Sequence, residues 1–218
     1  QFHPKRGISR TILSRTGTVP AHKDYNAEDF FIGRYHGGKI MMSEARLTHP
    51  KKAGEKVFDG IFVLIETQQK MFEGHTVITA DQNLAARLSK KLSSVPIHNG
   101  EYKRIFTALS SKPDAAGSVI KDALLKEFAE MHELFKKSTL SATFFQGKYV
   151  FVQIPYDEDM FEASNIFVPV TTSDAALRCK REIEQILSII DILNHIGEKP
   201  EDAPAVDTPT EDGPQNAD

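Results

Sequence analysis

The sequence predicts an α+β fold: an antiparallel or mixed sheet of about five strands, covered on one face by three helices. The nearly continuous apolar run Ile61–Ile65 is typical of a central strand that is buried on both faces. Residues 118–137 and 173–195 carry apolar side chains at helical spacing, and such stripes need a sheet to pack against. Gln146-Gly147 lies between two β-rich runs and indicates a two-residue hairpin.

The N-terminal part of the chain predicts one short helix followed by two strands. Apolar residues recur at helical spacing in residues 8–16, and Gly17 is a suitable stop. Residues 39–48 and 57–67 have the composition of strands. The segment Pro50–Lys56 between them contains proline, lysines and glycine, as hairpin connections often do.

The middle of the chain predicts two more strands and two helices. Residues 75–79 form a short β-rich run, and Asp81 then caps a helix over 81–92 in which leucines recur every four residues. Residues 101–109 predict a further strand. The helix 118–137 follows as the first clearly amphipathic one.

The C-terminal part predicts a hairpin, a long helix and a tail. Strands 140–145 and 148–154 form the hairpin, and the helix 173–195 ends before Gly197. We expect residues 1–196 to form a single globular α+β domain. Residues 197–218 contain seven acidic residues against Lys199 and almost no large apolar side chain, so we expect a disordered acidic tail.

The composition excludes several classes of site. Cys179 is the single cysteine, so the chain forms neither an internal disulfide nor a cysteine-based zinc site, and its place on an apolar helical stripe predicts a buried, unreactive thiol. No apolar run approaches the length of a membrane-spanning helix. The chain begins with glutamine rather than methionine, so we interpret it as a piece of a longer protein.

One segment approaches a nucleotide-binding motif. Residues 33–39 match the pattern G-x-x-x-x-G-K, in which backbone amides would hold a phosphate and Lys39 would contact its outer oxygens. The motif requires Ser or Thr next, to bind magnesium, whereas this chain has Ile40. The alternative interpretation of Gly33–Lys39 is a glycine-rich turn between two strands.

Other polar residues give no assembled catalytic set. Glu28 with Asp29, and Ser43 with Glu44, would suit acid–base chemistry, but adjacent residues on a strand point to opposite faces. The histidines lack the helical spacing of a zinc site, and the acidic run 157–159 lacks the pattern of a calcium loop. We therefore predict no catalytic residue, metal site or cofactor, and keep one candidate ligand site. Its residues are Glu28, Asp29, Gly33, Lys39, Ser43 and Glu44.

The first 23 residues are basic and contain no acid. Lys5, Arg6, Arg10 and Arg15 would suit contact with an anionic membrane surface, and a solvated helix face is the alternative interpretation. Basic residues are not interleaved with aromatic ones along any strand, so we expect no nucleic-acid partner.

Short motifs in a fixed order carry a family resemblance over nearly all of the chain up to Leu193. They include Phe2-His3-Pro4, Tyr25, Glu28-Asp29, Gly33, Ser43-Glu44, Phe58-Asp59-Gly60-Ile61-Phe62 and Phe72-Glu73-Gly74. In this pattern the chain resembles the bacterial family catalogued as domain of unknown function 3137, sometimes labelled galanin. The resemblance implies strands around Ser43-Glu44, and a soluble domain held at the cytoplasmic side of a membrane by a segment outside this chain. It implies no activity, cofactor or catalytic residue.

Two functions remain open from the sequence. The first is a non-enzymatic interaction or scaffolding module with an unknown protein partner, in a membrane-anchored bacterial protein. The alternative is a domain that binds a small ligand or anion, or hydrolyses one, with the Gly33–Lys39 segment and the nearby acids.

Overall fold

The computed structural model describes residues 1–156 and 174–197, and within them nine strands form one antiparallel sheet. The strand order is β1-β2-β3-β4-β9-β8-β5-β7-β6. The strands are β1 (Phe2–His3), β2 (Tyr25–Tyr35), β3 (Gly38–Thr48), β4 (Lys56–Glu66), β5 (Thr76–Thr79), β6 (Ser93–Val95), β7 (Thr107–Ser110), β8 (Ser141–Phe145) and β9 (Tyr149–Pro155). The helices are α1 (Arg10–Thr16), α2 (Gln82–Leu88), α3 (Gly100–Ile105), α4 (Pro113–Ala116), α5 (Asp122–Leu134) and α6 (Asp174–Gly197).

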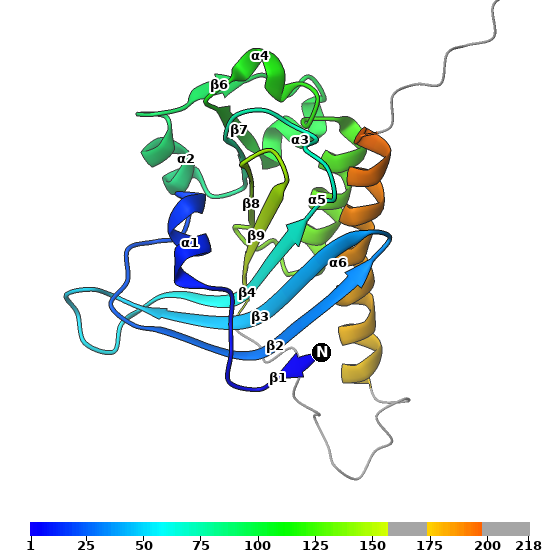
Figure 1. Cartoon of the computed structure of the whole chain (residues 1–218). Helices are drawn as coiled ribbons and strands as arrows, with labels where there is room; N and C mark the ends of the chain where they lie inside the picture. The colour runs from blue at the N-terminus through cyan, green and yellow to red at the C-terminus, as the bar shows by residue number, and fades with distance from the viewer. Residues whose placement is uncertain (157–173, 198–218) are drawn as a thin grey trace, which may run out of the picture.

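The sheet is assembled from a local part and a long-range part. Strands β2, β3 and β4 follow one another as a meander of long strands, seen in the lower half of Figure 1. Strand β9 then inserts beside β4, pairing Ile61 with Ile154 and Val63 with Val152. The β8–β9 hairpin joins this meander to the short strands β5, β7 and β6.

Alternation along β4 divides the core into two faces. Ile61, Val63 and Ile65 belong to the cluster that packs under α5 and α6, here called the α5/α6 face. Phe62 and Leu64 point the other way, toward the cluster that includes α1, here called the α1/α2 face. All five side chains are almost completely buried, which confirms the predicted two-sided central strand.

The helix signals with a local cause are confirmed. Gly17 ends α1 with a left-handed φ of 67°, as predicted. Ser9, which was not predicted as a cap, accepts a hydrogen bond from the backbone of Ile12 at the start of the same helix. Asp81 caps α2 by accepting from the backbone N–H groups of Asn83 and Leu84.

The prediction that all helices cover one face is wrong for α2. Its Leu84 and Leu88 pack on Val77 and Leu109, whereas the neighbouring Ile78 belongs to the α5/α6 cluster. Since adjacent strand residues point to opposite faces, α2 lies on the same side of the sheet as α1. Figure 1 shows α1 and α2 on one side and α5 and α6 on the other.

The predicted strand and helix counts are also too low. Strand β2 escaped prediction because a bulge between Glu28 and Phe31 interrupts its alternation. The predicted strand 101–109 is α3, capped by Asn99, followed by β7 after Phe106. The acidic run 157–159 and the side chain of Cys179 lie outside the described residues. The predicted tail 197–218 also lies outside them, except for Gly197, which is the last residue of α6.

Candidate functional site

The Gly33–Lys39 segment is the connection between β2 and β3. Gly33 pairs with Ile40 and Arg34 with Lys39, and the chain reverses at Tyr35–Gly38. Residues 38–48 form β3, so the helix that a phosphate-binding loop requires does not follow Lys39. Gly33–Lys39 is therefore a glycine-rich turn between two strands, which was the alternative interpretation of this segment.

The tip of this hairpin is attached to α6. The Tyr35 hydroxyl donates to Asp191 Oδ2 at 3.2 Å, and His36 Nδ1 lies 2.5 Å from Asp191 Oδ1. Gln68 Nε2 donates to the carbonyl of Gly37 at 3.0 Å. Burial, followed by the hydrogen bond to the Asp191 carboxylate, raises the pKa of Tyr35. These contacts give the polar tip residues a structural role.

The four remaining candidate residues divide between the two faces of the sheet. Glu28 lies directly opposite Glu44 in the β2–β3 register, which shifts between Glu28 and Phe31. Asp29 occupies the bulge with a left-handed φ of 51°. Ser43 is fully buried opposite Phe62, on the α1/α2 face. The structure therefore brings Glu28 and Glu44 together but places Ser43 on the other side of the sheet.

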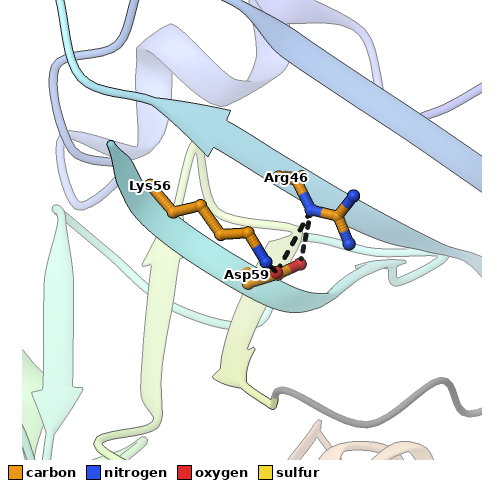
Figure 2. A network of polar contacts seen from close by, with 3 residues as sticks. All are labelled: Arg46, Lys56 and Asp59. Atoms are coloured by element: carbon orange, nitrogen blue, oxygen red, sulfur yellow. Dashed lines mark hydrogen bonds and ion pairs between the residues drawn. The ribbon is translucent and has the colours of Figure 1, made fainter. Parts of the chain in front are cut away.

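A charged network stands at the far end of β3 and β4. Figure 2 shows Arg46 and Lys56 converging on the Asp59 carboxylate, which Arg46 Nε reaches at 3.1 Å and Lys56 also contacts. Next to it, Gly60 has φ 152°, and a Cβ there would lie 2.2 Å from the carbonyl oxygen of Ile154. The motif residues Asp59 and Gly60 thus cross-link the strands and allow β9 to approach β4.

An open groove runs between α3, α5 and α6, with a volume of about 950 Å³. Its floor consists of the half-buried side chains of Tyr102, Ile105, Ala129 and Leu134. Its rim carries four glutamates and two basic residues, and Lys137 and Lys180 outside the lining form ion pairs with Glu133 and Glu184. These rim residues are Glu101, Glu130, Glu133, Glu184, Lys126 and Arg181.

A second hollow, of about 500 Å³, opens on the α1/α2 face between the segment after α1, the start of α2 and the end of β9. We call it the α1/α2 cavity. Gln153 lines it although that side chain is only 7% exposed. Sequence reasoning missed this residue. The available signal was a glutamine that interrupts the apolar run Val150–Ile154 of a central strand.

The basic residues near the N-terminus are all exposed. Lys5 and Arg6 lie in the connection after β1, and Arg10 and Arg15 lie on α1. The Arg10 guanidinium stands 5.6 Å from the centre of the Tyr25 ring. Among the described helices, none is long and apolar enough to cross a membrane. The described residues also contain no group of three or more His, Cys, Asp or Glu side chains arranged to hold a metal ion.

The family model described as "Protein of unknown function (DUF3137)" matches residues 56–195. The matched region begins at β4 and includes both the groove and Gln153. No curated protein and no solved structure matches the chain.

Proposed function

The chain belongs to the DUF3137 family of proteins of unknown function, and from this premise we propose that it is a non-enzymatic interaction module that receives a basic amphipathic helix of a partner protein. The observation that carries the proposal is the groove between α3, α5 and α6, with its apolar floor and acidic rim.

The shape of the groove suits a helix. Helix α5, with 13 residues, provides a straight wall about 20 Å long. The opposite wall is held in place because Gln185 of α6 donates to Glu127 Oε2 of α5 at 2.8 Å, and Ser188 donates to the same oxygen. A preformed wall lowers the ordering cost of binding. The apolar stripe of a partner helix would cover the floor, as in other helix-in-groove complexes.

The charge of the rim selects the partner's chemistry. Within the lining, glutamates outnumber basic residues by four to two, and Lys137 and Lys180 pair with two of those glutamates from outside it. Lysine or arginine on the partner's polar face would therefore be attracted modestly, chiefly where Glu101 and Glu130 stand. Exposed charges of this kind act mainly on the association rate and on specificity, and salt screens them.

Peptide binding tests this proposal. Fluorescence anisotropy would compare a designed amphipathic helix bearing lysines on its polar face with the same peptide bearing glutamates there. We expect the lysine peptide to bind more tightly, with an affinity that falls as salt rises. Ala129→Arg, in the floor, and the rim reversal Glu133→Lys should weaken it, whereas Ala123→Arg, exposed on α5 outside the groove, should not. Equal binding of the two peptides, or full binding by Ala129→Arg, would contradict the proposal.

We further propose that the full protein is a bacterial membrane-anchored protein that holds this domain on the cytoplasmic side. The support is the exposure of Lys5, Arg6, Arg10 and Arg15, together with the position of α1, which carries Arg10 and Arg15, on the side of the sheet opposite α5 and α6. Contact of that side with anionic lipid would leave the groove facing away from the membrane. Each basic residue near the lipid surface would contribute about 1 kcal/mol to the binding free energy. Co-sedimentation with liposomes checks this, because replacement of all four by glutamine should abolish a preference for anionic over neutral vesicles.

A further inference from the structure

We propose that the α1/α2 cavity binds a small, uncharged molecule with several hydroxyl groups, such as a monosaccharide or a polyol. The inference is independent of the helix-binding groove, which lies on the opposite face of the sheet. It rests on buried polar side chains in the central strands, in a part of the sheet where apolar residues are the rule.

Three of these side chains form one row across neighbouring strands. Thr79 of β5 lies opposite Ser141 of β8, which lies opposite Gln153 of β9. Directly opposed residues share a face, so this polar row stands on the α1/α2 face. Of the three residues, Gln153 lines the cavity. Thr79 and Ser141 are fully buried and Gln153 nearly so.

The polar row is only partly satisfied by the protein. Thr79 Oγ1 accepts from the backbone of Asp81 at 2.9 Å, and Thr18 and Thr143 hydroxyls bond each other at 3.1 Å nearby. Ser141 Oγ and Gln153 Oε1 are buried and make no hydrogen bond to the described residues. An unsatisfied buried polar atom is costly, and native proteins retain it where it has a use.

The charged residues at the mouth of the cavity argue for an uncharged ligand. Asp81 Oδ1 already accepts from two backbone N–H groups of α2, and Arg87 already donates to the carbonyl of Thr18 at 3.0 Å. The polar row beneath them has no charge. A charged group buried against it would lose its hydration, while Asp81 and Arg87 at the mouth are already engaged in hydrogen bonds within the protein.

Hydroxyl groups match what the cavity offers. Each one both donates and accepts, so it can pair with either end of the Gln153 amide, which lines the cavity. The last torsion of a glutamine is broad and roughly two-fold, so the amide can turn toward a ligand. The buried ring of Phe58 and the side chains of Leu84 and Pro155 line the apolar part. The volume of about 500 Å³ lies within the range typical of small-molecule sites.

Isothermal titration calorimetry with glucose, galactose and myo-inositol tests the inference, with gluconate and acetate as anionic probes of similar or smaller size. We expect at least one neutral probe to bind and the charged probes not to. Gln153→Leu should weaken that binding by about tenfold or more, equivalent to about 1.4 kcal/mol. Ala21→Trp, at an exposed position in the lining, should block the cavity without altering the core.

Gln82→Leu is the matched control, because it removes an exposed glutamine of α2 that does not line the cavity. It should bind the probe as the wild type does. Ordered water would satisfy Ser141 and Gln153 equally well without any ligand, and in that case no probe would bind. Absence of neutral binding, binding of the charged probes alone, or unchanged binding by folded Gln153→Leu and Ala21→Trp would each overturn the inference.

Discussion

Lys148 Nζ lies 2.5 Å from Glu66 Oε1, and this ion pair closes the end of the β4–β9 pairing. The Tyr149 hydroxyl donates to the same oxygen at 3.3 Å. The hydrogen bond from Lys148 lowers the pKa of Glu66 below its ordinary value of 4.5, and the carboxylate in turn raises the pKa of Lys148. The pair ties together two strands that are distant in the sequence.

Because of this ion pair, the free energy of unfolding should depend on pH in the acidic range. A carboxyl whose pKa is lower in the folded state stabilises that state above its unfolded pKa, and the contribution is lost as the pH falls through the folded pKa. We therefore expect the wild type to lose more unfolding free energy than Lys148→Met when urea titrations are compared from about pH 5 downward. Lys52→Met, which removes the exposed pair with Glu55, should follow the wild-type profile. Parallel profiles for the wild type and Lys148→Met would contradict this expectation.

Gly60 has no room for a side chain. A Cβ would lie 2.2 Å from the Ile154 oxygen and 2.7 Å from the Tyr156 nitrogen, at a φ of 152° that other residues rarely adopt. We expect Gly60→Ala to lower the free energy of unfolding by more than about 2 kcal/mol, measured by chemical denaturation. Gly33→Ala is the control, since nothing lies within 4 Å of its added Cβ, and it should change stability by less than about 0.5 kcal/mol. Similar losses in the two variants would refute the close-approach explanation.

Asp59 forms ion pairs with both Arg46 and Lys56 (Figure 2). Because both basic side chains are about half exposed, each pair is screened by solvent, and we expect Asp59→Asn to cost only about 0.5–1 kcal/mol. The loss should shrink as sodium chloride is raised, in thermal or urea unfolding. A loss that does not depend on salt would assign Asp59 a packing role instead of an electrostatic one.

Gln153 gives a prediction for stability without any ligand. Replacing a buried, unsatisfied amide by an apolar side chain of similar volume is nearly neutral or stabilising. We expect Gln153→Leu to unfold at the same or a higher urea concentration than the wild type. The comparison variant Val152→Thr places a hydroxyl on the α5/α6 face of the same strand and should destabilise the protein by about 1–3 kcal/mol. A large loss of stability in Gln153→Leu would mean that the amide is satisfied in the folded protein.

Features with a local cause could be predicted from the sequence. The caps Asp81 and Gly17 depend on a few neighbouring residues, and alternation correctly placed Ser43 and Glu44 on opposite faces of a strand. Which side of the sheet α2 covers could not be predicted, because an amphipathic helix shows only that it has a buried face. That choice depends on contacts with Val77 and Leu109.

The α1/α2 cavity could not be predicted from the sequence either, because it also depends on contacts between residues that are far apart in the chain. The hydroxyls of Thr18 and Thr143 meet although 125 positions separate them, and the row from Thr79 to Gln153 exists only once three strands are in register. Strand β2 was missed because the bulge around Asp29 disturbs the period that identifies a strand.

The position of β4 has a practical consequence for anyone who trims this protein to the part that the family model matches. A fragment that starts at Lys56 would lack β3, and eleven residues of β4 would offer unpaired amides and carbonyls along one side. Long, apolar, uncovered strands of this kind recruit further copies of themselves. Such a fragment should form soluble oligomers or precipitate on expression, so residues 1–55 act as the cover that keeps the sheet from growing.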